Sequence, residues 1–178
     1  IFEVRERMNA DGKVLEKIDF QFLASVLNDI KKKGFEVVAV SLLHSYINPD
    51  HELKVRNYFH DHFNSIPIVL SHEVAPEWRE YERTSTTVVS AYITPIVKDY
   101  LHRLSKELLN KYLKVPVHIT QSNGGSMSSS QASEQAVQTL FSGPVGGVVG
   151  GKEVGRLINQ SNMICIDMGG TSFDVSLI

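Results

Sequence analysis

Apolar residues near the start of the chain follow two spacings, one typical of helices and one typical of buried strands. After Asp19 they recur three and four residues apart, which predicts an amphipathic helix that Asp19 caps and Gly34 ends. The apolar face of this helix comprises Phe22, Leu23, Val26, Leu27 and Ile30. The uninterrupted apolar run at 37–43 instead predicts a strand buried on both faces, as in a parallel sheet.

Helical and strand patterns continue to alternate along the chain. Further helices are expected from Asn48-Pro49 to about Phe63 and from Pro76 onward, and further strands at 67–70 and 117–120. Thr94-Pro95 predicts the start of a separate helix, because proline fits the first helical turn. The alternation predicts the α/β class, with a largely parallel sheet and flanking helices.

A glycine-rich segment follows, in which six of the twelve glycines fall between Gly143 and Gly155 at helical spacing. Each glycine costs a helix about 1 kcal/mol relative to alanine, so something is expected to approach this backbone closely. Two interpretations remain open: close packing alone, or close packing together with a ligand at the helix start, Ser142 to Pro144. The run 146–152 approaches a Walker A loop, but Glu153 replaces the required Ser or Thr.

The last segment, 163–178, reads as strand, glycine turn and strand. Asp167 closes the first strand and Asp174 opens the second. The turn residues between them could hold a phosphate through backbone amides and hydroxyls: Gly169, Gly170, Thr171 and Ser172. Mg²⁺ prefers few carboxylates and several waters, so Asp167 is the first candidate metal ligand. Asp174 is a second candidate, or only holds the turn.

Other polar residues allow two interpretations each. Asn123, Gly124 and Gly125 follow a strand, where α/β proteins bind ligands, but Asn-Gly equally favours a type I′ turn. His44 follows a buried strand and either touches a ligand or is a hydrogen-bonded residue at the edge of the core. An acidic cluster with interleaved arginines is interpreted as a solvated ion-pair face, with ligand binding as the alternative: Glu73, Glu77, Arg79, Glu80, Glu82 and Arg83.

Composition limits the classes of partner. A formal net charge of -2 offers no field that would attract nucleic acid or an acidic membrane. No stretch reaches the roughly 20 apolar residues of a membrane span, and no signal peptide is visible, so a cytoplasmic location is expected. The chain begins with Ile1 and stops on an apolar strand, which suggests a piece of a longer protein.

Five sequence blocks together resemble the hydantoinase A/5-oxoprolinase family. They are Leu42-Leu-His-Ser-Tyr46, Glu80-Tyr-Glu-Arg-Thr-Ser-Thr86, Gln121-Ser-Asn-Gly-Gly125, Ser142-Gly-Pro144 and Asp167-Met-Gly-Gly-Thr-Ser172. The resemblance implies an actin-like ATPase (ribonuclease H-like) fold. It also implies ATP- and Mg²⁺-dependent opening of a small cyclic amide, a hydantoin or 5-oxoproline, often with a B-type hydantoinase subunit or domain as partner.

The resemblance also predicts how the chain is organised. Residues 1–160 would be the remainder of the first ATPase subdomain, with a crossover glycine helix at 143–158. Residues 161–178 would be the first phosphate hairpin of the second subdomain. Family members carry an earlier hairpin that this sequence lacks, so the isolated chain is expected to be inactive. Two alternatives are the ATPase subunit of an acetone-type ketone carboxylase and a non-enzymatic actin-like ATP switch.

Overall fold

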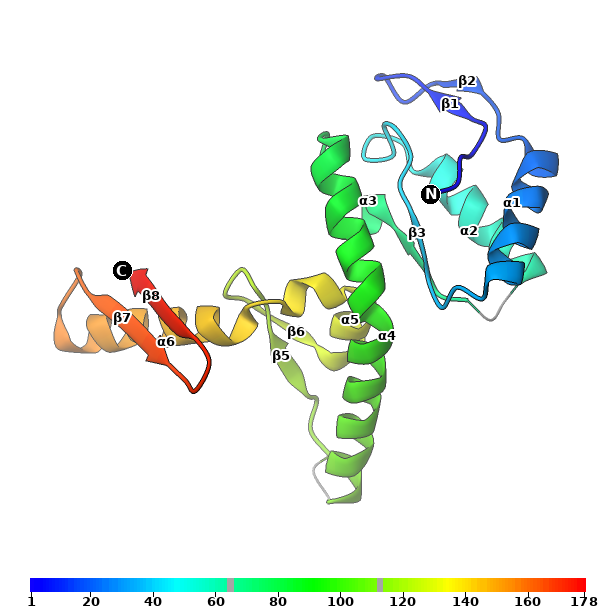
Figure 1. The fold of residues 1–178 in the computed structure, drawn as a ribbon. Helices are drawn as coiled ribbons and strands as arrows, with labels where there is room; N and C mark the ends of the chain where they lie inside the picture. Colours follow the sequence, from blue (N-terminus) through cyan, green and yellow to red (C-terminus); the bar gives the residue numbers. More distant parts are fainter. Residues whose placement is uncertain (64–65, 112–113) are drawn as a thin grey trace. The chain divides into compact units, whose positions relative to one another are not determined.

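The computed structural model describes residues 1–63, 66–111 and 114–178, which fall into two compact units. The first unit is Ile1–Pro95 and the second is Ile96–Ile178. Helix α4 belongs to both, because it runs across the boundary between them (Figure 1). Among the described residues, none of the helices combines the length and hydropathy needed to cross a membrane.

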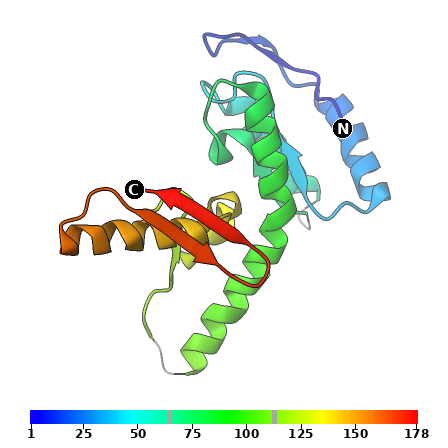
Figure 2. The same ribbon diagram turned by 60° about the vertical axis from the view of Figure 1, so that its left-hand side comes forward.

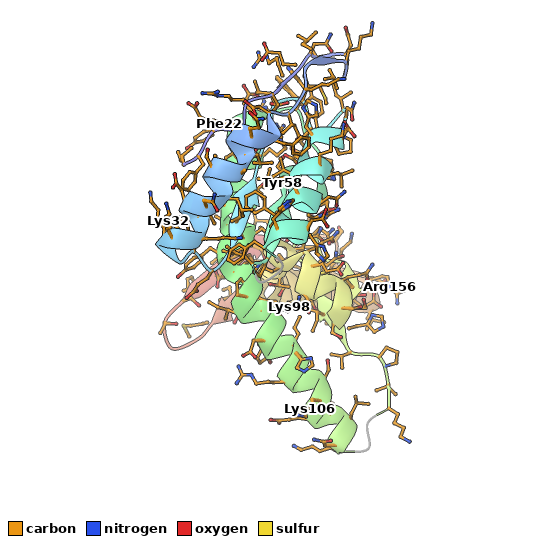
Figure 3. All side chains as sticks on the ribbon, turned by 90° about the vertical axis from the view of Figure 1, so that its right-hand side faces the viewer. Phe22, Lys32, Tyr58, Lys98, Lys106 and Arg156 are labelled. Carbon is orange, nitrogen blue, oxygen red and sulfur yellow. The ribbon has the colours of Figure 1, made fainter. Side chains whose placement is uncertain are left out.

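The first unit contains five short elements and two long helices before α4. In chain order its elements are β1 (Arg7–Met8), β2 (Val14–Glu16), α1 (Phe20–Lys33), β3 (Val38–Val40), α2 (Asp50–His62), β4 (Ile68–Leu70), α3 (Ser71–Val74) and the start of α4 (Glu80–Asn110). Its core is built from α1, α2 and the β3–β4 pair and includes Leu23, Ile30, Val55, Phe59 and Leu70. Phe22 on α1 and Tyr58 on α2 flank this core (Figure 3).

Helix α1 forms as its sequence predicts. The Asp19 side chain accepts a hydrogen bond from the Phe22 amide at 2.9 Å, and Gly34 ends the helix in the left-handed conformation with φ 67°. Its buried residues are Leu23, Val26, Leu27 and Ile30. Lys31 to Lys33 occupy the last turn, where cations interact favourably with the helix dipole.

The expected strands at 37–43 and 67–70 pair in parallel, with Val38 opposite Ile68 and Val40 opposite Leu70. The first of them is only three residues long, because the chain turns at Leu42, whose amide is bound by the Glu52 carboxylate. The expectation of a largely parallel sheet holds only in part. The described strands form four two-stranded sheets, and the other three are antiparallel.

The prediction of a separate helix starting at Thr94-Pro95 is wrong, because α4 continues through Pro95. Proline lacks the N–H that would bond the carbonyl four residues earlier, which normally weakens or kinks a helix. Here the Thr94 hydroxyl donates to the Ser90 carbonyl at 2.6 Å, within the turn that precedes the proline. The boundary between the two units falls at this same residue.

The second unit consists of two hairpins and two helices beyond the end of α4. Its elements are β5 (His118–Thr120), β6 (Ser126–Ser128), α5 (Ser129–Glu134), a short 3₁₀ turn at Ala136–Thr139, α6 (Ser142–Ile158), β7 (Ile164–Met168) and β8 (Phe173–Leu177). Leu101 of α4, Met127 of β6 and Ala132 of α5 form its small buried core. The β7–β8 hairpin lies along α6 (Figure 2).

Candidate functional site: the groove between helix α6 and the β7–β8 hairpin

The predicted strand, glycine turn and strand are present as β7 and β8. The two strands are antiparallel, with Asp167 directly opposite Asp174 and Met168 opposite Phe173. The Gly169 amide donates to the Ser172 carbonyl at 3.1 Å and closes the turn. That amide is therefore engaged within the turn, and the amides of Gly170 and Thr171 are better placed to meet an anion.

Residue alternation gives the hairpin two different faces, because successive side chains of a strand point to opposite sides. One face carries only large apolar side chains, all exposed: Ile164, Ile166, Met168, Phe173, Val175 and Leu177. The other face carries Cys165, Asp167, Asp174 and Ser176. The polar residues are thus gathered on a single face.

The polar face borders a groove of about 420 Å³. Four lining residues come from α6, namely Pro144, Val145, Gly147 and Val148, and the others come from the hairpin: Cys165, Ile166, Asp167, Asp174, Val175 and Ser176. One wall is therefore an apolar helix surface with one glycine, Gly147, and the other carries two carboxylates. The open glycine turn follows directly after Asp167 along the chain.

Asp167 and Asp174, here called the carboxylate pair, are like charges on directly opposed residues of two strands. Such residues have Cβ atoms about 5 Å apart, and like charges there are destabilising. Both residues are exposed, and no ion pair among the described residues includes either of them. A bound cation would turn this repulsion into attraction.

The structure partly resolves why α6 contains so many glycines. A Cβ on Gly151 would collide with the Cys165 sulfur, and one on Gly155 would come within 2.7 Å of the Gln160 carbonyl oxygen. Close packing against β7 and the chain leading into it therefore explains these two positions. Gly147 lines the groove, and a Cβ there would meet nothing within 4 Å. The hypothesis of a ligand at Ser142 to Pro144 stays a prediction, although Pro144 does line the groove.

The Asn123 segment forms the turn of the β5–β6 hairpin, but the turn is not type I′. That type requires positive φ at both central residues, whereas here Gly124, at φ 86°, is the one residue with positive φ. The Asn123 side chain accepts from the Gly125 amide at 2.8 Å. A Cβ on Gly124 would lie 3.1 Å from Val149 of α6, so this turn packs on the helix. None of Asn123, Gly124 and Gly125 lines the groove, and their ligand role stays a prediction.

The first unit contains a polar cluster that sequence reasoning missed. Glu52, Ser71, His72 and Arg83, here called the buried hub, join α2, α3 and α4, and Glu52 and Arg83 are 0% and 1% exposed. The Ser71 hydroxyl donates to Glu52 at 2.6 Å and accepts from Arg83 at 3.1 Å, so it links the two charges. The available signal was the position of Glu52 in the buried stripe of α2 with Val55 and Phe59.

The interpretation of the acidic cluster as a solvated face is therefore wrong for Arg83. Its guanidinium donates to the carbonyls of Glu77 at 2.6 Å and Leu42 at 3.0 Å, as well as to Ser71. The Arg79–Glu82 pair, at 3.4 Å and largely exposed, does fit the solvated interpretation. Arg83 contacts the turn after β3. The sequence blocks at 42–46 and 80–86 therefore meet in one buried cluster.

Known proteins resemble this chain along its whole length. Residues 1–63 match the model of the hydantoinase/oxoprolinase N-terminal region, and residues 83–178 match that of hydantoinase/oxoprolinase. The fold and the groove thus define an α/β protein of the hydantoinase type. The chain belongs to the hydantoinase/oxoprolinase family, as its five sequence blocks indicated.

Three individual comparisons describe the relationship. An uncharacterized protein of Methanocaldococcus jannaschii is 37% identical over 99% of this chain and 26% of its own length. The nucleotide-free structure of acetone carboxylase superposes with a TM-score of 0.89, at 31% identity over 98% of this chain and 25% of its own. The ATP-dependent caprolactamase of Pseudomonas jessenii superposes with a TM-score of 0.82, at 31% identity and the same coverage. The chain therefore spans about a quarter of these relatives.

Proposed function

We propose that this chain is part of an ATP-dependent enzyme that opens a small cyclic amide, and that the groove beside α6 receives the phosphates of ATP. The observation that carries the proposal is the carboxylate pair, which faces the groove next to an open glycine turn. Family membership and the ATP-dependent caprolactamase relative support the reaction class. A hydantoin, 5-oxoproline or another lactam is the proposed substrate.

The residues present fit a magnesium-bound triphosphate. Mg²⁺ is commonly held by one or two carboxylates plus phosphate oxygens and waters, and the pair supplies two carboxylates. Asp167 would hold the metal directly or through water, and Asp174 would assist. The exposed turn, where a Cβ on Gly169 or Gly170 would meet nothing within 4 Å, leaves room for phosphate oxygens beside the hydroxyls of Thr171 and Ser172.

The chemistry explains why a hydrolase would need ATP. An amide is a poor electrophile, and phosphorylation of its oxygen makes a carbon that water can attack. In phosphoryl transfer a protein contributes mainly positioning and charge neutralisation. The hairpin would position the phosphates through the amides of Gly170 and Thr171, and the open surface of Gly147 would let the nucleotide approach the α6 backbone.

The wider architecture belongs to the same proposal. Residues 1–160 would complete a first actin-like subdomain, with 143–158 as the crossover helix, and 161–178 would begin the second. A B-type hydantoinase subunit or domain would be the partner. This arrangement is supported by the contact between helix α6 and strand β7 within the second unit.

A second candidate is the ATP-using subunit of a ketone carboxylase, which the acetone carboxylase superposition favours. Assays on the complete complex would separate the two enzymes. ATP hydrolysis would be measured once with 5-oxoproline or hydantoin as the substrate and once with acetone plus bicarbonate. ATP use coupled stoichiometrically to either substrate would exclude a non-enzymatic ATP switch, the remaining alternative.

The central test is Asp167→Asn in the full-length protein. The variant should lose most ATP turnover and require much more Mg²⁺, because one of the two carboxylates is neutralised without a change in shape. Asp61→Asn, on the exposed end of α2, is the matched control and should behave as the wild type. Unchanged turnover of Asp167→Asn at saturating Mg²⁺ would refute the assigned role.

A further inference from the structure

The loop from Leu42 to Asn48, here called the His44 loop, connects β3 to α2 and contains an unusual backbone conformation. His44 has φ 59°, in the left-handed region that residues other than glycine seldom adopt. Glycine and asparagine adopt it more readily, so the turn by itself does not require a histidine. Residues held in sparsely populated backbone regions concentrate at functional sites.

The buried hub fixes the first half of this loop. Glu52 accepts from the Leu42 amide at 2.9 Å, and Arg83 donates to the Leu42 carbonyl at 3.0 Å. The hydroxyls of Ser45 and Ser71 are also hydrogen-bonded, at 3.0 Å. The amide and the carbonyl of Leu42 are therefore held by two buried ionic side chains of opposite charge. Burying two such ions is unfavourable compared with apolar packing, so the cluster contributes a defined conformation more than stability.

The second half of the loop is fixed from the other side. The Asn48 side chain donates to the Gly12 carbonyl at 2.8 Å, and a Cβ on Gly12 would lie 2.9 Å from the Ile47 side chain. The amides of Ile47 and Asn48 both donate to the His44 carbonyl, at 3.0 and 3.2 Å. The backbone on both sides of His44 is therefore immobilised by its neighbours.

The imidazole of His44, by contrast, is not engaged. No hydrogen bond or ion pair in the described part of the chain involves it, and its nearest aromatic neighbour is the Tyr46 ring, 6.2 Å away between centroids. Across residues 1–63, 66–111 and 114–178, the Ser90 hydroxyl is the one buried side-chain polar atom without a partner. His44 is half-buried, and its unbonded ring nitrogens therefore keep some solvent-accessible surface.

We propose that His44 contacts the substrate and that its imidazole hydrogen-bonds a carbonyl or carboxylate oxygen of it. A rigid loop that presents an unbonded imidazole is the arrangement expected of a binding residue, and this loop follows the carboxyl end of a parallel strand, where α/β proteins bind ligands. Imidazole can donate to an oxygen in either protonation state. The identification of the substrate as a cyclic amide rests on the proposed function.

The test is His44→Asn in the full-length protein, because asparagine tolerates the left-handed conformation and removes the imidazole. The unfolding midpoint and the affinity for ATP should stay as in the wild type. With 5-oxoproline, hydantoin and caprolactam as probes, the KM of the substrate that is turned over should rise about tenfold, as for one lost hydrogen bond.

His60→Asn is the control, because His60 lies largely exposed on α2 and should tolerate the change. An unchanged KM in His44→Asn would overturn the proposal. So would a variant His44→Gly that keeps the wild-type KM, because His44 would then serve only the turn. These failures are distinct from failure of the proposed function, which would appear as undiminished ATP turnover in Asp167→Asn.

Discussion

The buried hub and the carboxylate pair place acidic side chains in opposite circumstances. Glu52 is completely buried and accepts four hydrogen bonds, from the Leu42 amide, the Ser71 hydroxyl, and the amide and ring of His72. Asp167 and Asp174 are exposed and face each other across a hairpin. The difference shows that an acidic side chain of this protein can be fully hydrogen-bonded in the core or exposed without an ion-pair partner.

The largest expected effect comes from breaking the buried hub. Arg83→Met should lower the free energy of unfolding by about 3–5 kcal/mol, because it breaks a buried network and leaves the Ser71 hydroxyl and the Glu77 and Leu42 carbonyls without their donor. Urea denaturation would measure the loss. Arg79→Met, which removes an exposed arginine one helical turn away, should change stability by no more than about 1 kcal/mol. Equal effects of the two substitutions would contradict the distinction between hub and surface.

The second prediction compares two glycines of α6, one in close contact with β7 and one facing open space. Gly151→Ala should lower the free energy of unfolding by about 1–3 kcal/mol, because its methyl group would collide with the Cys165 sulfur of β7. Gly147→Ala should raise it by up to about 1 kcal/mol, because the site is open and alanine favours the helix.

The same Gly147→Ala variant tests the groove. If a nucleotide approaches the helix there, ATP affinity in the full-length protein should fall even though the fold becomes more stable. Titration calorimetry combined with a thermal melt would separate the two effects. A stabilised variant with unaltered ATP affinity would remove Gly147 from the proposed site.

A smaller effect is expected within the carboxylate pair in the absence of divalent cations. Asp174→Asn should stabilise the protein by about 0.2–1 kcal/mol, because it removes a cross-strand repulsion. Added Mg²⁺ should stabilise the wild type more than this variant, since a ligand that binds the folded state raises its stability. Thermal melts with and without Mg²⁺ measure both differences, and an identical response to the metal would argue against binding at the pair.

The smallest effect concerns the surface of α6. The bidentate Arg156 guanidinium lowers the pKa of the Glu153 carboxyl below its ordinary value. A lowered pKa in the folded state gives a stabilisation that is present above the unfolded pKa and is lost as pH falls through the folded one. Glu153→Gln should therefore melt slightly below the wild type at neutral pH and together with it in acid. A difference that grew on acidification would reverse the expected sign.

The sequence by itself was sufficient to predict an element wherever that element depends on local interactions. The Asp19 cap, the Gly34 stop and the turn between Asp167 and Asp174 depend on residues a few positions apart, so their patterns predicted helix α1 and the β7–β8 hairpin correctly. The family was equally accessible, because five short blocks in a fixed order carry it.

Only the tertiary structure decided the features that depend on distant neighbours. In the sequence Arg83 is one charge in an acidic run that looks exposed. In the structure it is buried, because the Ser71 hydroxyl and the Glu77 and Leu42 carbonyls accept hydrogen bonds from its guanidinium. In the sequence Pro95 favours a helix start, but in the structure it lies inside α4, which begins 15 residues earlier at Glu80. Sequence pattern records what each residue favours locally. Burial depends on which segments meet, and this decides whether a charged side chain lies in the core or stays exposed.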